Sequence, residues 1–155
     1  MKKEEIINAE LRIIEWGKSL LQTDNNLWFT SFSDGKWATA DVISHLINWD
    51  RFFLEQRIPY IIKKVPFPNL EVDEDKMNDE AAIYARSGVT KEQLIKEFIE
   101  TRQQVISILE DITESEYGQM LIVGERELPL ANYLLLHIEH DLKHQTQIDD
   151  FLKNR

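Results

Sequence analysis

Hydrophobic residues recur along most of the chain at spacings of three and four, the period of a helix that buries one face. A first helix is predicted over residues 2–22, where the apolar positions are Ile6, Ile7, Leu11, Ile13, Ile14, Leu20 and Leu21. A second helix begins near Thr39 and carries apolar and aromatic residues on one side. Pro59 is expected to interrupt it, because proline removes a backbone hydrogen bond and crowds the preceding turn.

Two further long helices are predicted in the second half of the chain. The third follows Thr90, whose spacing to Gln93 is that of a capping box. The last runs from Pro129, in its first turn, to about Leu152. Residues 65–89 form a connection that is longer than a hairpin between neighbouring helices needs. The predicted fold is therefore all-α, a four-helix bundle with a long crossing connection between its second and third helices.

Several shorter segments depart from the long-helix pattern. Residues 23–26 are rich in turn formers and are expected to end the first helix. A short helix is expected over residues 79–86, and the acidic stretch 71–80 is interpreted as a solvated loop. Residues 121–128 contain β-branched side chains around Gly124 and are expected to be extended.

Composition narrows the class of protein. A length of 155 residues suits one domain over residues 1–155, and the absence of cysteine excludes a disulfide scaffold, a thiolate metal site and a cysteine nucleophile. The 28 acidic residues outnumber the 18 basic ones, and this charge argues against nucleic acid or an anionic membrane as a partner. No apolar run approaches the ~18 residues of a membrane span, and no signal region follows Met1. These features predict a soluble, cytoplasmic protein.

The four histidines are the strongest functional candidates. His45 lies on the inward stripe of the second predicted helix, and His137, His140 and His144 share a narrow arc of the last one. His140 and His144 are four residues apart, so their rings can converge on one ion, and His45 can supply a third nitrogen. Three imidazoles leave a coordination position open, which is typical of a catalytic metal site. The alternative is a set of hydrogen-bonded core histidines.

Two residues beside this pattern are the weaker candidates for a catalytic role. His137 can be a fourth ligand, a partner of a ligand or a proton shuttle, but the spacing of His140 and His144 favours it as a non-ligand. Asp141 flanks the same stripe and can orient a ligand ring through a hydrogen bond. A solvated or capping aspartate is the equally simple interpretation of Asp141.

Two stretches of the chain resemble the DinB/YfiT-like family. They are Trp37-Ala-Thr-Ala-Asp-Val-Ile-Ser-His45-Leu-Ile and His140-Asp-Leu-Lys-His144-Gln-Thr-Gln147-Ile, and element order and spacing match over nearly the whole chain. The resemblance implies a four-helix bundle with a crossing connection, a nickel or zinc ion held by His45, His140 and His144, and a homodimer. The chain departs from the family at Gln145-Thr146, where relatives often have Arg-Gly, so a substrate contact there does not carry over.

The resemblance also implies a class of function. Characterised members include thiol S-transferases that use bacillithiol, mycothiol or glutathione, and a mycothiol-dependent isomerase; others are described as metal-dependent hydrolases without a known substrate. We therefore expect a metal-dependent transferase that adds a low-molecular-weight thiol, such as bacillithiol, to an electrophilic small molecule. Because the chain lacks cysteine, that thiol must be a diffusible cosubstrate. The alternatives are a hydrolase in which the ion activates water, and a non-catalytic bundle that binds or sequesters a small ligand.

Overall fold

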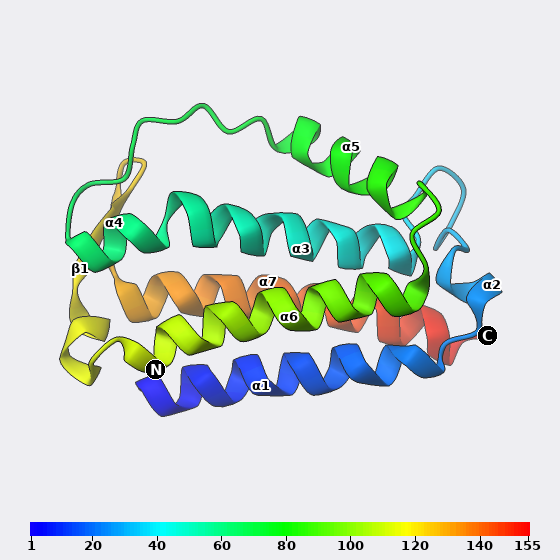
Figure 1. Ribbon diagram of the computed structural model, residues 1–155, viewed down its shortest axis with the longest axis horizontal. Helices are drawn as coiled ribbons and strands as arrows, with labels where there is room; N and C mark the ends of the chain where they lie inside the picture. Colours follow the sequence, from blue (N-terminus) through cyan, green and yellow to red (C-terminus); the bar gives the residue numbers. More distant parts are fainter.

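Four long helices lie side by side in the computed structural model, which describes residues Met1–Arg155 (Figure 1). They are α1 (Lys3–Ser19), α3 (Thr39–Gln56), α6 (Lys91–Asp111) and α7 (Leu130–Lys153). Both α1 and α3 pack against α6 and α7, so α1 and α3 lie diagonally across the bundle. This arrangement confirms the predicted all-α four-helix bundle. None of the helices is both long and apolar enough to cross a membrane.

The connection between α3 and α6 travels the length of the bundle. In Figure 1, α1 and α7 run in one direction, and α3 and α6 run in the other. Because the neighbours α3 and α6 are parallel, the chain between them has to return to the end where α3 began. It does so through α4 (Ile58–Lys63), an irregular stretch, and α5 (Glu74–Ala85), which packs against α3. The crossing connection and the interruption at Pro59, which lies in the first turn of α4, are both confirmed.

Residues 23–26 end the first helix as expected. The 3-10 helix η1 (Leu20–Gln22) continues α1 up to this point, and a separate short helix, α2 (Asn25–Trp28), begins within the segment. Asp24 caps α2, since its carboxylate accepts the N–H of Asn26 at 2.7 Å. The prediction that residues 71–80 form a loop is wrong, because most of this acidic stretch is helical. Asp73 accepts the N–H of Lys76 at 3.0 Å, so α5 begins five residues before the predicted start.

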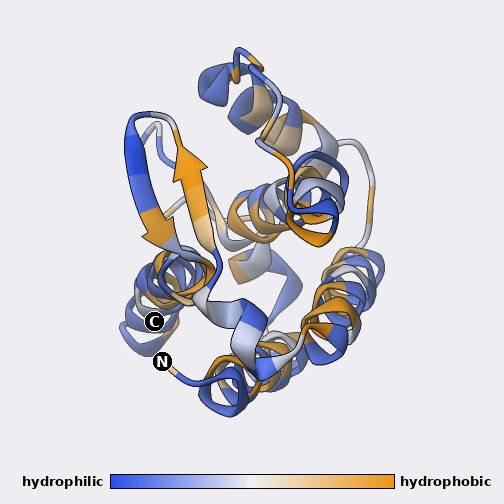
Figure 2. Ribbon diagram, turned by 90° about the vertical axis from the view of Figure 1, so that its left-hand side faces the viewer, coloured by the Kyte–Doolittle hydropathy of each residue, from blue (hydrophilic) through white to orange (hydrophobic).

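A β-hairpin joins α6 to α7. It follows the 3-10 helix η2 (Glu114–Gly118) and consists of β1 (Met120–Val123) and β2 (Arg126–Pro129), with Leu121 opposite Leu128. Gly124 has a φ of 64° in the turn, a conformation that glycine adopts without strain. Figure 2 shows β1 as the apolar strand and β2 as largely polar. The extended prediction is confirmed, although Pro129 precedes α7 as its N-cap and does not lie in its first turn.

One layer of charged residues divides the apolar interior into two clusters. Ile6, Phe53 and Leu109 belong to the cluster nearer the hairpin, and Ile13 and Phe98 belong to the other. Each long helix contributes one residue between them, and together they form the charged layer: Glu10 of α1, Asp50 of α3, Arg102 of α6 and Asp141 of α7. The layer lies within the bundle, and three of its members, Asp50, Arg102 and Asp141, also line the cavity described below.

Candidate metal centre

Three of the four histidines come together between α3 and α7, and they form what we call the histidine cluster. His45 projects from α3 and is buried, whereas His140 and His144 lie one turn apart on α7 and are more accessible. One ring nitrogen from each residue lies within 4.8 Å of those of the other two. The structure therefore juxtaposes the three residues whose spacing predicts a metal site.

Hydrogen bonds orient two of the three rings. The Nδ1 atom of His45 lies 2.8 Å from Oδ1 of Asn78, which α5 supplies. Because an amide oxygen only accepts, Nδ1 of His45 carries the proton and Nε2 carries the lone pair. In the same way, Nδ1 of His144 lies 3.2 Å from Oε1 of Gln147. Metal-binding imidazoles typically donate their second N–H in this manner.

The arrangement of the Nε2 atoms fits a divalent metal ion. Nε2 of His45 is buried and has no hydrogen-bond partner, which is costly for a polar atom unless another group satisfies it. The Nε2 atoms of His140 and His144 are 3.2 Å apart. Two imidazole nitrogens bound at ~2.1 Å to one tetrahedral ion would lie about 3.4 Å apart. The histidine cluster could therefore hold a metal ion, with imidazole nitrogen as the donor that zinc and nickel accept.

The surroundings keep two of the three rings, those of His45 and His144, in the protonation state that binds metals. Burial lowers the pKa of His45 to about 4, and the hydrogen bond to Asn78 offsets only part of this effect. Burial also lowers the pKa of His144. Both rings are consequently neutral at pH 7, and a neutral imidazole is the form that coordinates metals.

A cavity of about 490 Å³ lies beside the histidine cluster. His140 and Asn78 belong to its lining, so the cavity adjoins the candidate ion position. Its aromatic walls consist of Trp49, Phe52, Phe53 and Tyr133. A volume of this size lies within the range of ~300–1,000 Å³ found for small-molecule sites.

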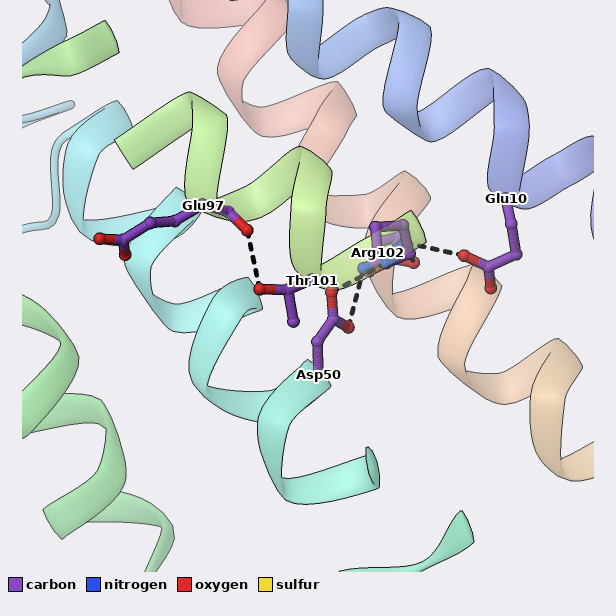
Figure 3. A network of polar contacts seen from close by, with 6 residues as sticks. Glu10, Asp50, Glu97, Thr101 and Arg102 are labelled. Carbon is purple, nitrogen blue, oxygen red and sulfur yellow. Dashed lines mark hydrogen bonds and ion pairs between the residues drawn. The ribbon is translucent and has the colours of Figure 1, made fainter. Parts of the chain in front are cut away.

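Asp50, Arg102 and Asp141 of the charged layer form another part of the cavity lining. Arg102 is fully buried, and its Nε and one Nη bond both carboxylate oxygens of Asp50, at 2.9 and 3.0 Å (Figure 3). Its other Nη bonds Glu10 at 2.9 Å and Asp141 at 2.8 Å. Burial raises the pKa of Asp50 to about 6 and that of Glu10 to about 7, although Arg102 acts against both shifts. Three carboxyl groups thus share one guanidinium.

The two weaker candidates lie beside the cluster and not in it. His137 packs against the rings of Phe53 and Tyr133, with centroid separations of 5.0 and 4.7 Å, and lines the cavity. Asp141 bonds Arg102 and forms no hydrogen bond with a histidine, in contrast to the orienting role that the sequence suggests. The residues that orient rings are Asn78 and Gln147. The role of Asn78 could not be predicted from the sequence, because no spacing rule links it to His45.

Comparisons with known proteins agree on the fold. YfiT from Bacillus subtilis, described as a probable metal-dependent hydrolase with an unusual four-helix bundle topology, is 15% identical with a TM-score of 0.77, and the match covers 98% of this chain and 86% of YfiT. The colibactin self-resistance protein ClbS, solved in complex with double-stranded DNA, is 18% identical with a TM-score of 0.75, and the match covers 98% of this chain and 96% of ClbS. A mycothiol-dependent maleylpyruvate isomerase is 13% identical with a TM-score of 0.73; the match covers 96% of this chain but only 61% of the isomerase.

The family assignment rests on sequence. No match was found among curated proteins. Residues 18–148, however, match the sequence profile of the DinB superfamily, and this range includes all three members of the histidine cluster. The profile covers most of the chain, and the fold of the solved relatives agrees with it. The chain therefore belongs to the DinB superfamily.

Proposed function

We propose that the protein is a metal-dependent transferase that joins a low-molecular-weight thiol, such as bacillithiol, to an electrophilic small molecule. The observation that supports this most is the position of the 490 Å³ cavity next to the histidine cluster, since His140 belongs to both. Three imidazole ligands leave room for a substrate at the ion, and the cavity provides room for the second substrate. The sulfur has to come from a diffusible thiol, because the chain has no cysteine.

Different residues of the chain would hold the ion, orient its ligands and bind the electrophile in such a reaction. His45, His140 and His144 would hold the ion, nickel or zinc, and Asn78 would keep the lone pair of His45 available. When bound, such an ion lowers the pKa of a coordinated thiol and so supplies a thiolate at neutral pH. The aromatic walls of the cavity would bind the electrophile and exclude water. An S–C bond forms, and the thiol proton departs with the leaving group or, in an addition, goes to the neighbouring carbon.

The test measures the rate at which bacillithiol displaces the chloride of monochlorobimane in the presence of the protein. We expect turnover that EDTA abolishes, and that His140→Ala reduces to the chemical background. Glu139→Ala changes an exposed neighbour on α7 and should retain the wild-type rate. If no metal-dependent turnover exceeds the chemical rate with bacillithiol, mycothiol or glutathione, the transferase proposal is refuted.

Metal-dependent hydrolysis is the second candidate function. It is favoured by the fold shared with YfiT, which is described as a probable metal-dependent hydrolase. An ion in the histidine cluster would then activate water in place of a thiol. Hydrolysis of 4-nitrophenyl esters that needs the metal, but proceeds without any thiol, would support this candidate over the transferase.

We infer that the partner is a small molecule and not DNA, even though ClbS was solved with double-stranded DNA. The chain carries a formal charge of -10, and DNA binding depends largely on contacts between basic side chains and phosphates. We therefore expect no electrophoretic shift of a DNA duplex at physiological salt. A salt-dependent shift at micromolar protein would overturn this inference.

A further inference from the structure

Arg57 is the cation of the cavity lining that forms no ion pair. The other cation, Arg102, is engaged by three carboxylates. Arg57 lies between α3 and α4 and is half-buried; one Nη donates to the carbonyl oxygen of Gln56 at 2.9 Å. Its Nε is buried without a hydrogen-bond partner. In a chain with a charge of -10, an arginine that lines a cavity and has no carboxylate partner indicates a site for an anion.

Aromatic rings hold the guanidinium of Arg57 in place. Its central carbon lies 4.8 Å from the ring centroid of Phe52 and 4.6 Å from that of Phe67. Contacts with ring faces leave the N–H donors in the guanidinium plane free for other partners. Phe52 also belongs to the cavity wall, together with Trp49 and Tyr133. The anion site is therefore continuous with an aromatic surface that suits an apolar body.

The acidic residues of the same lining fix where an anion can lie. Asp50 and Asp141 are bonded to Arg102, and Glu74 is exposed where α5 begins. An anion near any of these carboxylates would be repelled, whereas at Arg57 it would gain charge-assisted hydrogen bonds. His140 lines the cavity too, so a ligand anchored at Arg57 shares this space with the histidine cluster.

We propose that the cavity binds a small organic acid, with its carboxylate on Arg57 and an aromatic or other apolar body against Trp49, Phe52 and Tyr133. This deepens the proposed function, on which it rests for the reaction, because it names the chemical class of the electrophile. Because binding of the acid does not require turnover, this proposal can be tested separately from the proposed thiol transfer.

The test measures binding of phenylacetate and of its neutral counterpart phenylacetamide by ligand-observed NMR. In the wild-type protein, phenylacetate is expected to bind at least about tenfold more tightly, the effect of charge-assisted hydrogen bonds. Arg57→Gln should weaken phenylacetate binding by a similar factor and leave phenylacetamide unchanged. Arg51→Gln is the matched control, because Arg51 lies on α3, six residues before Arg57, and outside this cavity.

Two further measurements show whether the carboxylate binds at Arg57 or on the metal ion, and whether Arg57 instead binds the thiol. Phenylacetate should bind equally before and after EDTA treatment, and glutathione, a polar anionic thiol, should not displace it. Equal binding of acid and amide to the wild type would overturn the proposal without relying on any variant. So would acid binding that EDTA removes but Arg57→Gln does not, because the carboxylate would then lie on the ion. Displacement by glutathione would assign Arg57 to the thiol and also overturn it. Acid binding without thiol transfer would refute only the proposed reaction.

Discussion

Replacing Arg102 with methionine tests whether the charged layer is as tightly coupled as the structure indicates. Arg102→Met keeps an unbranched side chain of comparable length but removes the only cation among Glu10, Asp50 and Asp141. The guanidinium makes five hydrogen bonds of 2.8 to 3.3 Å with these carboxylates. The variant would leave all three acids inside the bundle with no opposite charge.

The expected loss of folding free energy follows from the cost of leaving buried carboxylates without an opposite charge. Removing one partner of a buried ion pair costs about 3–5 kcal/mol, and here one cation serves three partners, so at pH 8 we expect a loss at the upper end of this range. The acids can escape part of the cost by binding protons. Burial already raises the pKa of Asp50 to about 6 and that of Glu10 to about 7, and losing Arg102 raises both further. The deficit should therefore shrink as the pH falls, by about 1.4 kcal/mol per pH unit for each additional proton held.

Urea unfolding followed by tryptophan fluorescence at pH 8 and pH 5 measures this deficit. Lys96→Met is the control, because it removes an exposed cation on the same helix that pairs with Glu100 at 3.7 Å, and it should cost less than about 0.5 kcal/mol. Combining Arg102→Met with leucine at Glu10, Asp50 and Asp141 should recover most of the lost stability. A loss below about 1 kcal/mol for Arg102→Met, equal at both pH values, would show that the layer is solvated and refute the reasoning.

Three other substitutions test separate parts of the structure. Asn78→Ala should lower metal affinity about 10–100-fold in a chelator competition, whereas the exposed Asp79→Ala should not, and equal affinities would deny Asn78 its orienting role. Burial lowers the pKa of His137 from 6.5 to about 4, so folding stability present above pH 6.5 is lost as the pH falls toward 4. In metal-free protein, His137→Leu should reduce the loss between pH 7 and pH 5 by about 2 kcal/mol; an unchanged loss would contradict this. Gly17→Ala would place Cβ 2.7 Å from a ring carbon of buried Phe98, so urea unfolding should show a net loss of roughly 1–2 kcal/mol, and a gain in stability would contradict the packing.

Features that depend on local periodicity could be predicted from the sequence alone. The inward stripe of α3 places His45 beside Val42 and Trp49, and the four-residue spacing aligns His140 with His144 on α7. A bundle has few ways to pair such faces, so the meeting of these three rings could be predicted. Capping side chains were the main source of local error, because Asp73 starts α5 earlier than its hydrophobic pattern does.

Features that depend on tertiary contacts could not be predicted. Arg102 bonds Glu10, Asp50 and Asp141, which lie 92, 52 and 39 residues away in the chain. A charged side chain is expected to face solvent, so the sequence pattern gives no reason to place Arg102 inside the bundle. Asn78 reaches His45 only because α5 packs along α3, a packing that the sequence pattern does not specify.

The most direct test of the central claim is the metal content of protein purified without an affinity tag. Elemental analysis is expected to find one divalent ion per chain in the wild type. The ion should be lost in His140→Ala, which removes a member of the histidine cluster, and retained in His137→Ala, which removes the histidine outside it. Circular dichroism is the control that checks whether both variants are folded. Equal metal content in the two variants would contradict the assignment of His45, His140 and His144 as the ligands.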